Sequence, residues 1–351
     1  MSRVFVAMSG GVDSSVAAAL LVEQGHDVTG VTMQIWPSTD EEGGCCSIAA
    51  TRDAKRVCDM LDIPHYTLDF RAAFEREVIA YFAAEYAAGR TPNPCIACND
   101  RLKFADLLAR VSLQGADALA TGHYARITQA PEGSPWLSRG IDPSKDQSYF
   151  LYRMTEPQLE RTLFPIGELH KTEVRDIAVR MGLPTATKTE SQDTCFERAG
   201  SYVPVIDERH PEALTPGDIV DQDGKVLGRH HGIARYTVGQ RKGLGIGGLA
   251  EPLFVTAIDA ASGRVVVGPR EALSVSRLEC DDHFWRGDPA GETLEIMVRY
   301  RMRPVAAHVV VEQGQLVARL DDPLDSAVTG QALVCYRGDT VVGGGTISCV
   351  S

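Results

Sequence analysis

The sequence predicts an α/β doubly wound parallel sheet followed by small β-rich modules, the last of them a barrel. Three observations support this. Strand-like apolar runs alternate with helical patterns through the first half of the chain, and a glycine-rich turn directly follows the first run. Short β-branched runs separated by Gly, Pro and Asp turns fill the remainder. The first pattern is typical of βαβ units, and the last of sandwiches and barrels.

The elements of the first half follow from this alternation. We expect strands at residues 4–8, 28–35, 65–69 and 116–120, and helices at 14–24, 48–61, 71–89 and 99–113. One or two further helices are expected within 159–182. In sheets built this way, ligands bind beyond the carboxyl ends of the strands, where the glycine-rich turn falls.

From about residue 217, helical periodicity fades. Strand-like runs follow at 218–227, 253–259, 264–267, 294–299, 305–312, 315–320, 332–336 and 340–347. These runs predict one or two small all-β modules. We expect a first domain at residues 1–200, a central β-rich domain at 201–270 and a β-barrel domain at 271–351.

Composition limits the class of protein. The 351 residues have ordinary globular proportions, and no apolar run reaches membrane-spanning length. Because a strand begins almost at Met1, we expect no signal peptide and a cytoplasmic protein. A net charge of −12 argues against broad nucleic-acid binding. Two local basic stretches remain, residues 229–245 and 299–303, and each suits either RNA contact or a solvated strand face.

The turn Ser9-Gly-Gly-Val-Asp-Ser14 has the features of a phosphate-binding loop. Its glycines permit a tight turn and close approach of a ligand, and the helix N-terminus that follows favours anions. It lacks the lysine of the usual P-loop. It resembles the PP-loop of ATP pyrophosphatases, which split ATP into AMP and pyrophosphate. The alternative is a Gly-rich turn with a Ser/Asp cap. We expect residues 37–44 to form a mobile loop over the nucleotide site.

The nine cysteines are expected to be reduced, metal-binding or catalytic in a cytosolic protein. Cys95 and Cys98 follow the turn Thr91-Pro-Asn-Pro94, ahead of a helix expected near Asn99, a position that lowers a thiol pKa. Cys195 lies in a polar loop, and no second C-x-x-C supports a structural zinc site. The remaining cysteines are expected to be loop residues (Cys45, Cys46) or buried thiols (Cys58, Cys280, Cys335, Cys349).

Several segments together resemble one family, the tRNA-specific 2-thiouridylases (the MnmA/TrmU family). The most specific are Lys145-Asp-Gln-Ser-Tyr-Phe-Leu151 and Thr237-Val-Gly-Gln-Arg-Lys-Gly-Leu244. The others are Ser9–Ser15, Gly89–Pro94 with Cys98-Asn99, Thr121–Ala125, Asp142, Phe164–Gly167, Ser191–Phe196, Gly228–Gly232, Val298–Arg301, Gly330-Gln331 and Gly343–Gly345. The resemblance spans almost the whole chain.

The resemblance implies an ATP-dependent exchange of the C2 oxygen of the wobble uridine for sulfur. Adenylation of that oxygen, with release of pyrophosphate, makes AMP the leaving group, and sulfur then attacks C2. The resemblance implies that Cys195 carries a persulfide received from a sulfur carrier protein. It also implies that Cys98 attacks this persulfide, releasing sulfide or forming a disulfide.

The family pattern also implies binding residues. ATP, with Mg²⁺ near Asp13, is expected at Ala7, Met8, Ser9, Gly10, Gly11, Val12, Asp13, Ser14, Met33 and Gly122. Transfer RNA is expected at Asn93, Pro94, Cys95, His123, Lys145, Asp146, Gln147, Arg299, Tyr300 and Gln331. A target base must leave its stack to reach such a site.

One departure opens a second hypothesis. Many relatives have Asp where this chain has Cys95, and the change creates a set of three thiols, Cys95, Cys98 and Cys195. Related thiolases hold a [4Fe-4S] cluster on three cysteines, which leaves one iron open. This alternative requires the three thiols to lie within a few ångströms of one another.

Two other classes of function compete. A PP-loop ligase or amidotransferase acting on a small molecule would explain the glycine turn but leave the cysteines and the β-rich half unused. A non-catalytic, ATP-gated RNA-binding module would predict that replacing Cys98 or Cys195 changes no activity.

Overall fold

The computed structural model describes residues 1–35, 48–130, 132–189, 195–197, 201–247, 251–287, 291–325 and 327–351. The expected loop at 37–44, with Cys45 and Cys46, lies outside the described residues, as does most of the segment 191–196. The chain divides into two compact units. The first comprises Met1–Val78, Cys95–Gly200 and Asp339–Val341, and the second Ile79–Pro94, Ser201–Gly338 and Val342–Ser351.

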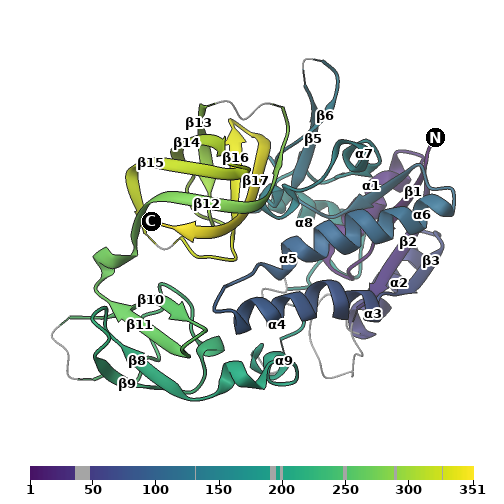
Figure 1. Ribbon diagram of the computed structural model, residues 1–351. Coiled ribbons are helices and arrows are strands. Elements are labelled where there is room, and N and C mark those ends of the chain that lie inside the picture. Colours follow the sequence, from purple (N-terminus) through teal and green to yellow (C-terminus); the bar gives the residue numbers. More distant parts are fainter. Residues whose placement is uncertain are drawn as a thin grey trace. The chain divides into compact units, whose positions relative to one another are not determined.

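A parallel sheet forms the centre of the first unit (Figure 1). Its described strands are β1 (Arg3–Ala7), β2 (Asp27–Gln34), β3 (His65–Asp69), β4 (Ala118–Thr121) and β7 (Thr162–Leu163), in the order β3-β2-β1-β4-β7. Every neighbouring pair in this order is parallel. The chain therefore runs outward from β1 through β2 and β3, then returns to the other side of β1 with β4. The carboxyl ends of β1 and β4 flank the point where the order reverses, which is where such folds bind ligands.

Helices complete this unit. They are α1 (Val12–Glu23), α2 (Ile48–Met60), α3 (Arg71–Phe74), the π-helix η1 (Glu75–Ile79), α5 (Pro94–Ala97), the π-helix η2 (Cys98–Leu107), α6 (Leu108–Leu113), the 3₁₀ turn η3 (Ser148–Leu151), α7 (Glu156–Glu160) and α8 (Lys171–Arg180). The hairpin β5 (Ala125–Gln129) and β6 (Pro135–Arg139) pairs with Thr340 through Ser138.

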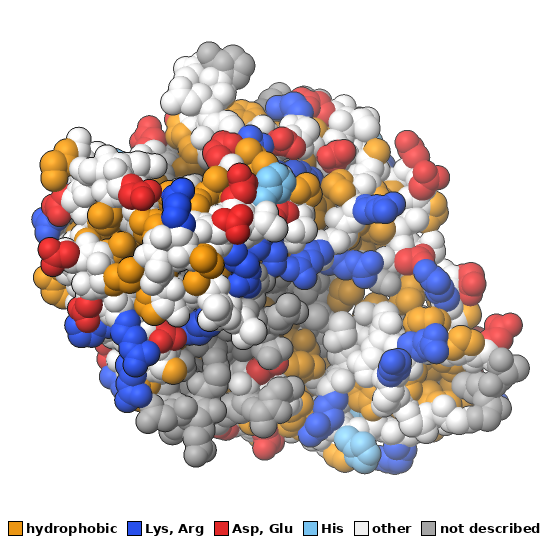
Figure 2. All heavy atoms as spheres, turned by 180° about the vertical axis from the view of Figure 1, so that it is seen from behind, with side chains coloured by type: hydrophobic (Ala, Val, Ile, Leu, Met, Phe, Trp, Pro, Cys, Tyr) orange, Lys and Arg blue, Asp and Glu red, His pale blue; other side chains and the backbone are white. Residues whose placement is uncertain are grey.

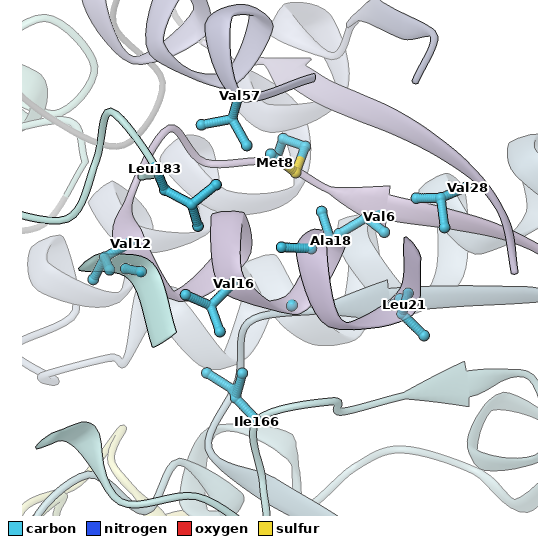
Figure 3. Packing of buried hydrophobic residues seen from close by; sticks show 14 of the residues in the cluster. Val6, Met8, Val12, Val16, Ala18, Leu21, Val28, Val57, Ile166 and Leu183 are labelled. Atoms are coloured by element: carbon cyan, nitrogen blue, oxygen red, sulfur yellow. The ribbon is translucent and has the colours of Figure 1, made fainter. Parts of the chain in front are cut away.

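Helix α1 is buried on nearly all sides, as its sequence requires. Val16 and Ala18 are fully buried in a core with Val6 of β1, Val57 of α2 and Ile166, and Figure 3 shows these side chains converging on α1. A helix without a polar face must be enclosed. The core thus fixes the position of the helix whose N-terminus follows the glycine turn.

The second unit holds two β modules. In the first, the order is β10-β11-β8-β9, with β8 (Gly217–Val220), β9 (Val226–His230), β10 (Phe254–Asp259) and β11 (Arg264–Gly268). In the second, the described strands β12 (Ser274–Trp285), β13 (Glu292–Met297), β14 (Val305–Glu312), β15 (Gln315–Asp325), β16 (Ala332–Arg337) and β17 (Thr340–Val350) run β12-β15-β14-β13-β16-β17, and β12 also pairs with β17, which closes a barrel. The helical elements are α4 (Ala80–Ala87), α9 (Val203–Asp207), η4 (Pro211–Leu214), η5 (Ile233–Arg235) and η6 (Arg270–Leu273).

The structure differs from the sequence-based expectations at identifiable places. The strands β5, β6, β7 and β12 were not expected, and the run 218–227 is a hairpin of two strands. The helix expected at 99–113 begins five residues earlier, at Pro94, because proline is favoured in the first turn of a helix. The division at 200/201 and 270/271 remains a prediction.

One cysteine expected to be buried is not. Cys58, Cys280 and Cys335 are buried, but Cys349 is exposed. A register shift between β12 and β17 lies beside it, since Glu279 pairs with Cys349 and Cys280 with Ile347. The extra residue, Ser348, reverses the alternation of side chains and turns Cys349 outward.

Candidate functional site

The glycine turn after β1 is braced by its own side chains. Gly10 has φ +67°, and a Cβ there would lie 2.1 Å from the Ala50 carbonyl oxygen, so no other residue fits without a shift. The Ser14 hydroxyl lies 3.1 Å from the Ser9 hydroxyl and donates to the Gly11 carbonyl at 3.2 Å. The N-cap residue of α1 is Gly11, which has no side chain to cap the helix. The first N–H groups of this helix are therefore directed at a position suited to an anion.

Gly122, after β4, packs directly against the start of α1. A Cβ at Gly122 would lie 2.6 Å from the Ser14 nitrogen. This approach brings the turn after β4 against the turn after β1, at the point where the strand order reverses. Two segments proposed from the sequence for ATP therefore lie side by side.

A buried lysine lies at the glycine turn, and sequence reasoning missed it. Lys171, the first residue of α8, is 9% exposed, and its Nζ donates to both carboxylate oxygens of Asp13 at 2.7 and 2.9 Å. The Tyr124 hydroxyl donates to the same carboxylate at 2.8 Å. The available signal was its place, at a helix start just beyond the last strand of the sheet. Lys171 supplies the positive charge that this loop lacks in comparison with a P-loop.

The backbone at Lys171 is fixed by Asp142. One carboxylate oxygen of Asp142 accepts the Lys171 N–H at 3.0 Å, and the other accepts the backbone N–H and hydroxyl of Ser144. Burial raises the pKa of Asp142, but these hydrogen bonds outweigh it and hold the pKa below its ordinary value. Asp142 is therefore ionised near neutral pH and holds the start of α8 in place.

A second lysine contacts the turn itself. The Lys188 Nζ donates to the Gly10 carbonyl at 2.9 Å and to the Asp53 carboxylate at 2.6 Å. Because Asp53 lies on α2, Lys188 ties the glycine turn to that helix. The sequence offered no pattern that distinguishes Lys188 from other surface lysines.

Met33, expected beside adenosine, is a buried residue of β2. Its neighbour Thr32 donates to the Met8 carbonyl at 2.9 Å and lies 2.9 Å from Nε2 of His65. Burial, and then the charge of Lys55, lower the pKa of His65. The neutral ring therefore donates to Thr32, and the arrangement fixes β1 against β2 below the glycine turn.

Cys95 and Cys98 lie on one helical segment that changes its winding at Cys98. Cys95 is exposed within α5, and Cys98 is half-buried at the first position of the π-helix η2. π-helical turns are frequent at functional sites. The next residue, Asn99, is 4% exposed, and within the described part of the chain its Oδ1 has no hydrogen-bond partner. Cys95, in the first turn, is therefore nearer than Cys98 to the charge of the helix N-terminus.

Hydrogen bonds connect the glycine turn to this helix within the first unit. From Asp13 the path leads to Tyr124, whose backbone N–H donates to the Gln147 side chain at 3.0 Å and whose carbonyl accepts the Gln147 N–H at 2.8 Å. The Phe150 N–H donates to the Gln147 carbonyl, and the Phe150 carbonyl accepts the Asn99 amide at 3.4 Å. The structure thus joins the proposed nucleotide loop, the Lys145–Gln147 motif and the Cys98 helix.

Two residues expected to bind RNA are enclosed by protein. Asp146 is 9% exposed and accepts hydrogen bonds from the Gly140 and Ser148 backbones and from the Ser148 hydroxyl. His123 is buried, with its Nδ1 2.7 Å from the Thr121 hydroxyl. Burial, and then the charge of Lys103, lower the pKa of His123 well below its ordinary value. Both side chains shape the segments that carry them, while Lys145 and Gln147 are half-buried.

Cys195 lies in a short described segment, 195–197, and is half-buried. The ring of the next residue, Phe196, packs against Phe74 with centroids 6.3 Å apart. Helix α3, which carries Phe74, contacts η2, and the Arg101 side chain of η2 donates to the Glu77 carbonyl just beyond α3. The segment of Cys195 therefore packs on a helix that itself packs on the Cys98 helix. A direct meeting of the two thiols remains a prediction.

The three-thiol set does not fit an iron–sulfur cluster here. Across the described ranges, which include Cys95, Cys98 and Cys195, no three His, Cys, Asp or Glu side chains gather closely enough to hold a metal ion. An open [4Fe-4S] site needs three thiolates around one cluster. We therefore derive no step through such a group.

The remaining predicted RNA residues belong to the second unit. Arg299 is exposed, Asn93, Pro94 and Tyr300 are half-buried, and the Gln331 amide donates to the Thr91 carbonyl at 2.9 Å. In the other basic stretch, His230 is buried between Gly263 and Gly232, whereas Arg241 and Lys242 are exposed. Figure 2 shows Lys and Arg side chains gathered in groups on the face drawn, despite the acidic balance of the chain.

Three sequence models of protein families match in succession. Residues 2–198 match a tRNA methyl transferase HUP domain, 205–269 a tRNA methyl transferase PRC-barrel domain and 276–347 an aminomethyltransferase β-barrel domain. The chain is thus a HUP/PP-loop α/β domain followed by a PRC-barrel and a C-terminal β-barrel, as expected for its fold class. Among the described residues, no helix has both the length and the apolar character needed to cross a membrane.

Full-length relatives are closely similar. A tRNA-specific 2-thiouridylase MnmA of Heliobacterium modesticaldum is 50% identical over 98% of this chain and 92% of its own length. One of Moorella thermoacetica is 49% identical over 99% of both chains. An NMN synthetase structure from Francisella tularensis is 21% identical, covers 59% of this chain and 76% of its own, and has a TM-score of 0.34, which is too low to support a conclusion. The chain belongs to the family of tRNA-specific 2-thiouridylases.

Proposed function

We propose that this protein replaces the C2 oxygen of the wobble uridine of tRNA by sulfur, using ATP. The observation that carries this is the hydrogen-bonded path from Asp13 of the glycine turn to Asn99, next to Cys98. An ATP-activating loop and a nucleophilic thiol joined in one unit suit a two-step thiolation. The full-length relatives bear the 2-thiouridylase name, whereas two of the three domain descriptions mention tRNA methyl transfer, a reaction that does not require an ATP-activating loop.

The first step activates the base. The uracil O2 attacks the α-phosphate of ATP, a new P–O bond forms, and the bond to the β-phosphate breaks with release of pyrophosphate. The N-terminus of α1 would hold the phosphates, since its N-cap residue Gly11 has no side chain. Lys171, buried beside Asp13, would neutralise charge that develops on the phosphates. A fixed charge in a buried site needs little reorganisation when the reaction occurs.

Magnesium would arrive with the nucleotide. Within the described residues no set of three acidic or other ligand side chains gathers, so a cage made only of protein groups does not fit. Mg²⁺ bound to substrate phosphates typically takes one or two protein carboxylates. Asp13 fits that role once Lys171 turns toward the phosphates. The metal would neutralise phosphate charge there.

The second step transfers sulfur. Cys195 would receive a persulfide from a carrier protein, and the Cys98 thiolate would attack the Cys195 sulfur. This attack forms a Cys98–Cys195 disulfide and releases hydrosulfide, which adds to C2 and expels AMP. The two cysteine sulfurs supply the two electrons that the terminal sulfur gains and are oxidised to the disulfide, so an external dithiol must reduce this disulfide before the next turnover. Because tRNA, ATP and thiol reductants are all cytoplasmic, we expect the enzyme to act there.

RNA contacts are proposed for two groups of residues. The segment Asn93–Cys95, at the start of α5, would receive the extruded base, together with the Lys145–Gln147 motif and the turn of His123. Arg299 and Tyr300 would contact tRNA at the barrel, whereas the amide of Gln331 is already bonded to the Thr91 carbonyl. Contacts from a few cations make affinity dependent on salt even when the chain as a whole is acidic.

An in vitro assay tests the proposal. Unmodified tRNA, ATP, dithiol and a protein persulfide as the sulfur source are incubated with the protein, and 2-thiouridine, AMP and pyrophosphate are quantified. We expect one AMP and one pyrophosphate per thiolated base. Cys98→Ser should abolish product, whereas Cys349→Ser, which alters an exposed thiol outside the network, should leave it intact. Pyrophosphate release stimulated by a small molecule without RNA would instead support a ligase, and full activity of Cys98→Ser a non-catalytic RNA-binding protein.

A further inference from the structure

The second unit contains a short connecting segment that leads into the cysteine-bearing helix. Residues 89–94, here called the strap, join α4 to α5 and end at Pro94, the first residue of α5. Gly89 has φ +74°, and a Cβ there would lie 3.0 Å from both the carbonyl oxygen and the side chain of Ile258 on β10. Arg90 pairs with Glu85 of α4. The start of the strap is therefore packed against the PRC-barrel module.

The barrel contacts the strap at Thr91, two residues beyond Gly89. The Thr91 N–H donates to the Thr329 carbonyl at 2.9 Å, and the Gln331 side-chain amide donates to the Thr91 carbonyl at 2.9 Å. Between them, Gly330 has φ +90°, and a Cβ there would lie 2.9 Å from the Thr91 nitrogen. Both polar groups of the Thr91 backbone are thus bonded to one barrel loop, residues 328–331, which approaches as closely as a glycine allows.

This loop is itself firmly seated in the barrel. Gly330 donates its N–H to the Ile347 carbonyl, and the Ile347 N–H donates to the Gln331 carbonyl, each at 2.8 Å. Ile347 is fully buried on β17. The clamp on Thr91 is therefore a rigid extension of the barrel and not a contact between two flexible segments.

An arginine-bearing turn lies at the same end of the barrel. Met297, the last residue of β13, pairs with Val334 near the start of β16, so the turn 299–303 and the loop 328–331 adjoin the same strand ends. Arg299, Arg301 and Arg303 are exposed in that turn, and Arg301 has φ +62°, an uncommon backbone conformation for a residue other than glycine. One end of the barrel therefore carries both exposed cations and the clamp.

We propose that Gln331 is a positioning residue that sets the start of the Cys95–Cys98 helix through Thr91 and the strap. Its side-chain donor acts on the protein backbone, so its role begins before any RNA is bound. The expected effect on catalysis rests on the proposed thiolation. The position of the strap and of the helix start does not depend on it.

The test compares Gln331→Met with Gln315→Met. Methionine keeps the size of glutamine and removes the donor. Gln315 is the matched control, because its amide bonds to Asp281 elsewhere on the same barrel. For each variant, alkylation of Cys98 by iodoacetamide without RNA is followed by fragment mass spectrometry, which separates it from Cys95. The kcat and the KM for tRNA are measured with the thiolation assay, and circular dichroism and Tm report folding.

We expect Gln331→Met to raise the RNA-free alkylation rate of half-buried Cys98 by about threefold or more, because a released strap lets the first helical turn open. We expect kcat to fall about tenfold, with the KM for tRNA within about twofold. Gln315→Met should change neither. A raised KM with unchanged kcat and unchanged RNA-free alkylation would show that Gln331 only contacts RNA, and would overturn the inference.

Two further measurements keep the inference testable if a variant misfolds or if thiolation is absent. In the unaltered protein, hydrogen exchange at the Thr91 amide should be slowed, and rapid exchange there would contradict the clamp. Gly330→Ala should displace the strap by a steric route and raise Cys98 alkylation in the same direction. If wild-type protein thiolates no RNA, the alkylation comparison still decides the positioning role, while the proposed function alone fails.

Discussion

The end of the parallel sheet holds charged side chains, whereas the interior of the barrel holds uncharged thiols. At the sheet, the buried side chains of Lys171 and Tyr124 bond to the half-buried carboxylate of Asp13. In the barrel, Cys280 and Cys335 are buried thiols, and burial raises the pKa of each far above its ordinary value. The first region retains charge at the cost of desolvation, whereas the second keeps its groups neutral.

This difference indicates which region carries out the reaction and which region stabilises the fold. Buried charge is expensive unless it is paired, so its presence beside an uncapped helix N-terminus indicates a reaction site. Neutral thiols in an apolar interior behave as small hydrophobic residues. The same distinction applies among the cysteines, since Cys98 and Cys195 are half-buried near polar segments and Cys58, Cys280 and Cys335 are enclosed.

The sharpest contrast is between cysteines. Cys98→Ser should lower thiolation by at least about 10³-fold, because a hydroxyl is a poor nucleophile toward a persulfide. Cys335→Ser should retain activity but lower the free energy of unfolding by about 1–3 kcal/mol, since a hydroxyl would be buried without a hydrogen bond. Thiolation assays and urea unfolding check the pair. Equal losses of activity would remove the distinction between the regions.

The charge at the sheet can be tested at Lys171. Lys171→Met should lower RNA-dependent pyrophosphate release by about 10²-fold, since it removes a cation aimed at the phosphates. The control is Lys55→Met, which breaks the exposed pair with Asp59 and should change the rate by less than about twofold. Pyrophosphate is measured with saturating tRNA and varied ATP. An unchanged rate in Lys171→Met would mean that this cation serves only Asp13.

The effect of the close contact between Gly10 and Ala50 can be separated from the effect of the positive φ angle. Gly10→Ala should destabilise the protein by about 2–4 kcal/mol and abolish ATP binding, because its Cβ would overlap the Ala50 carbonyl. Gly25→Ala shares a positive φ but meets nothing within 4 Å, so it should cost only about 1 kcal/mol. Urea unfolding and ATP titration give both values. Similar effects at the two positions would argue that packing against α2 is unimportant.

The smallest expected effect concerns pH. Burial, and then Asp59, raise the pKa of Cys58 from its ordinary 9.0 to about 11. Between these values the unfolded chain ionises while the folded chain does not, so this contribution to stability is present below pH 9 and is lost as the pH rises toward 11. The free energy of unfolding, followed by urea titration across this range, should fall less steeply in Cys58→Ala. Identical slopes would contradict the raised pKa.

Local patterns predicted much of the first unit. The glycine turn, α1 and β3 lie where the sequence places them, because alternation and turn chemistry are local properties. β12 was missed, since Asp281 and Asp282 interrupt its pattern and Asp282 has φ +46° at a register shift. The helix start at Pro94 was misplaced although proline signalled it.

The sequence predicted individual segments of the site but not the contacts between them. Ser9–Ser14 and the Cys95–Cys98 motif were visible as short strings. The contact of Lys171 with Asp13 joins positions 158 residues apart, and the bond of Gln331 to Thr91 joins positions 240 apart. Such pairs depend on the folded topology, and no periodicity in one sequence encodes them.

The membership of residues Ile79–Pro94 in the second unit bears on how the chain can be divided and synthesised. The aromatic rings of Phe82 and Tyr86 pack against Tyr202, Phe82 edge to face and Tyr86 tilted with its centroid 4.8 Å from that of Tyr202. A fragment that ends near residue 200 lacks Tyr202, so the hydrophobic side chains of α4 are exposed to water. On the ribosome, the nascent amino-terminal half must likewise wait for the later helical segments α9, η4 and η5 before α4 can pack. Truncation near residue 200 is therefore expected to give a poorly folded catalytic half.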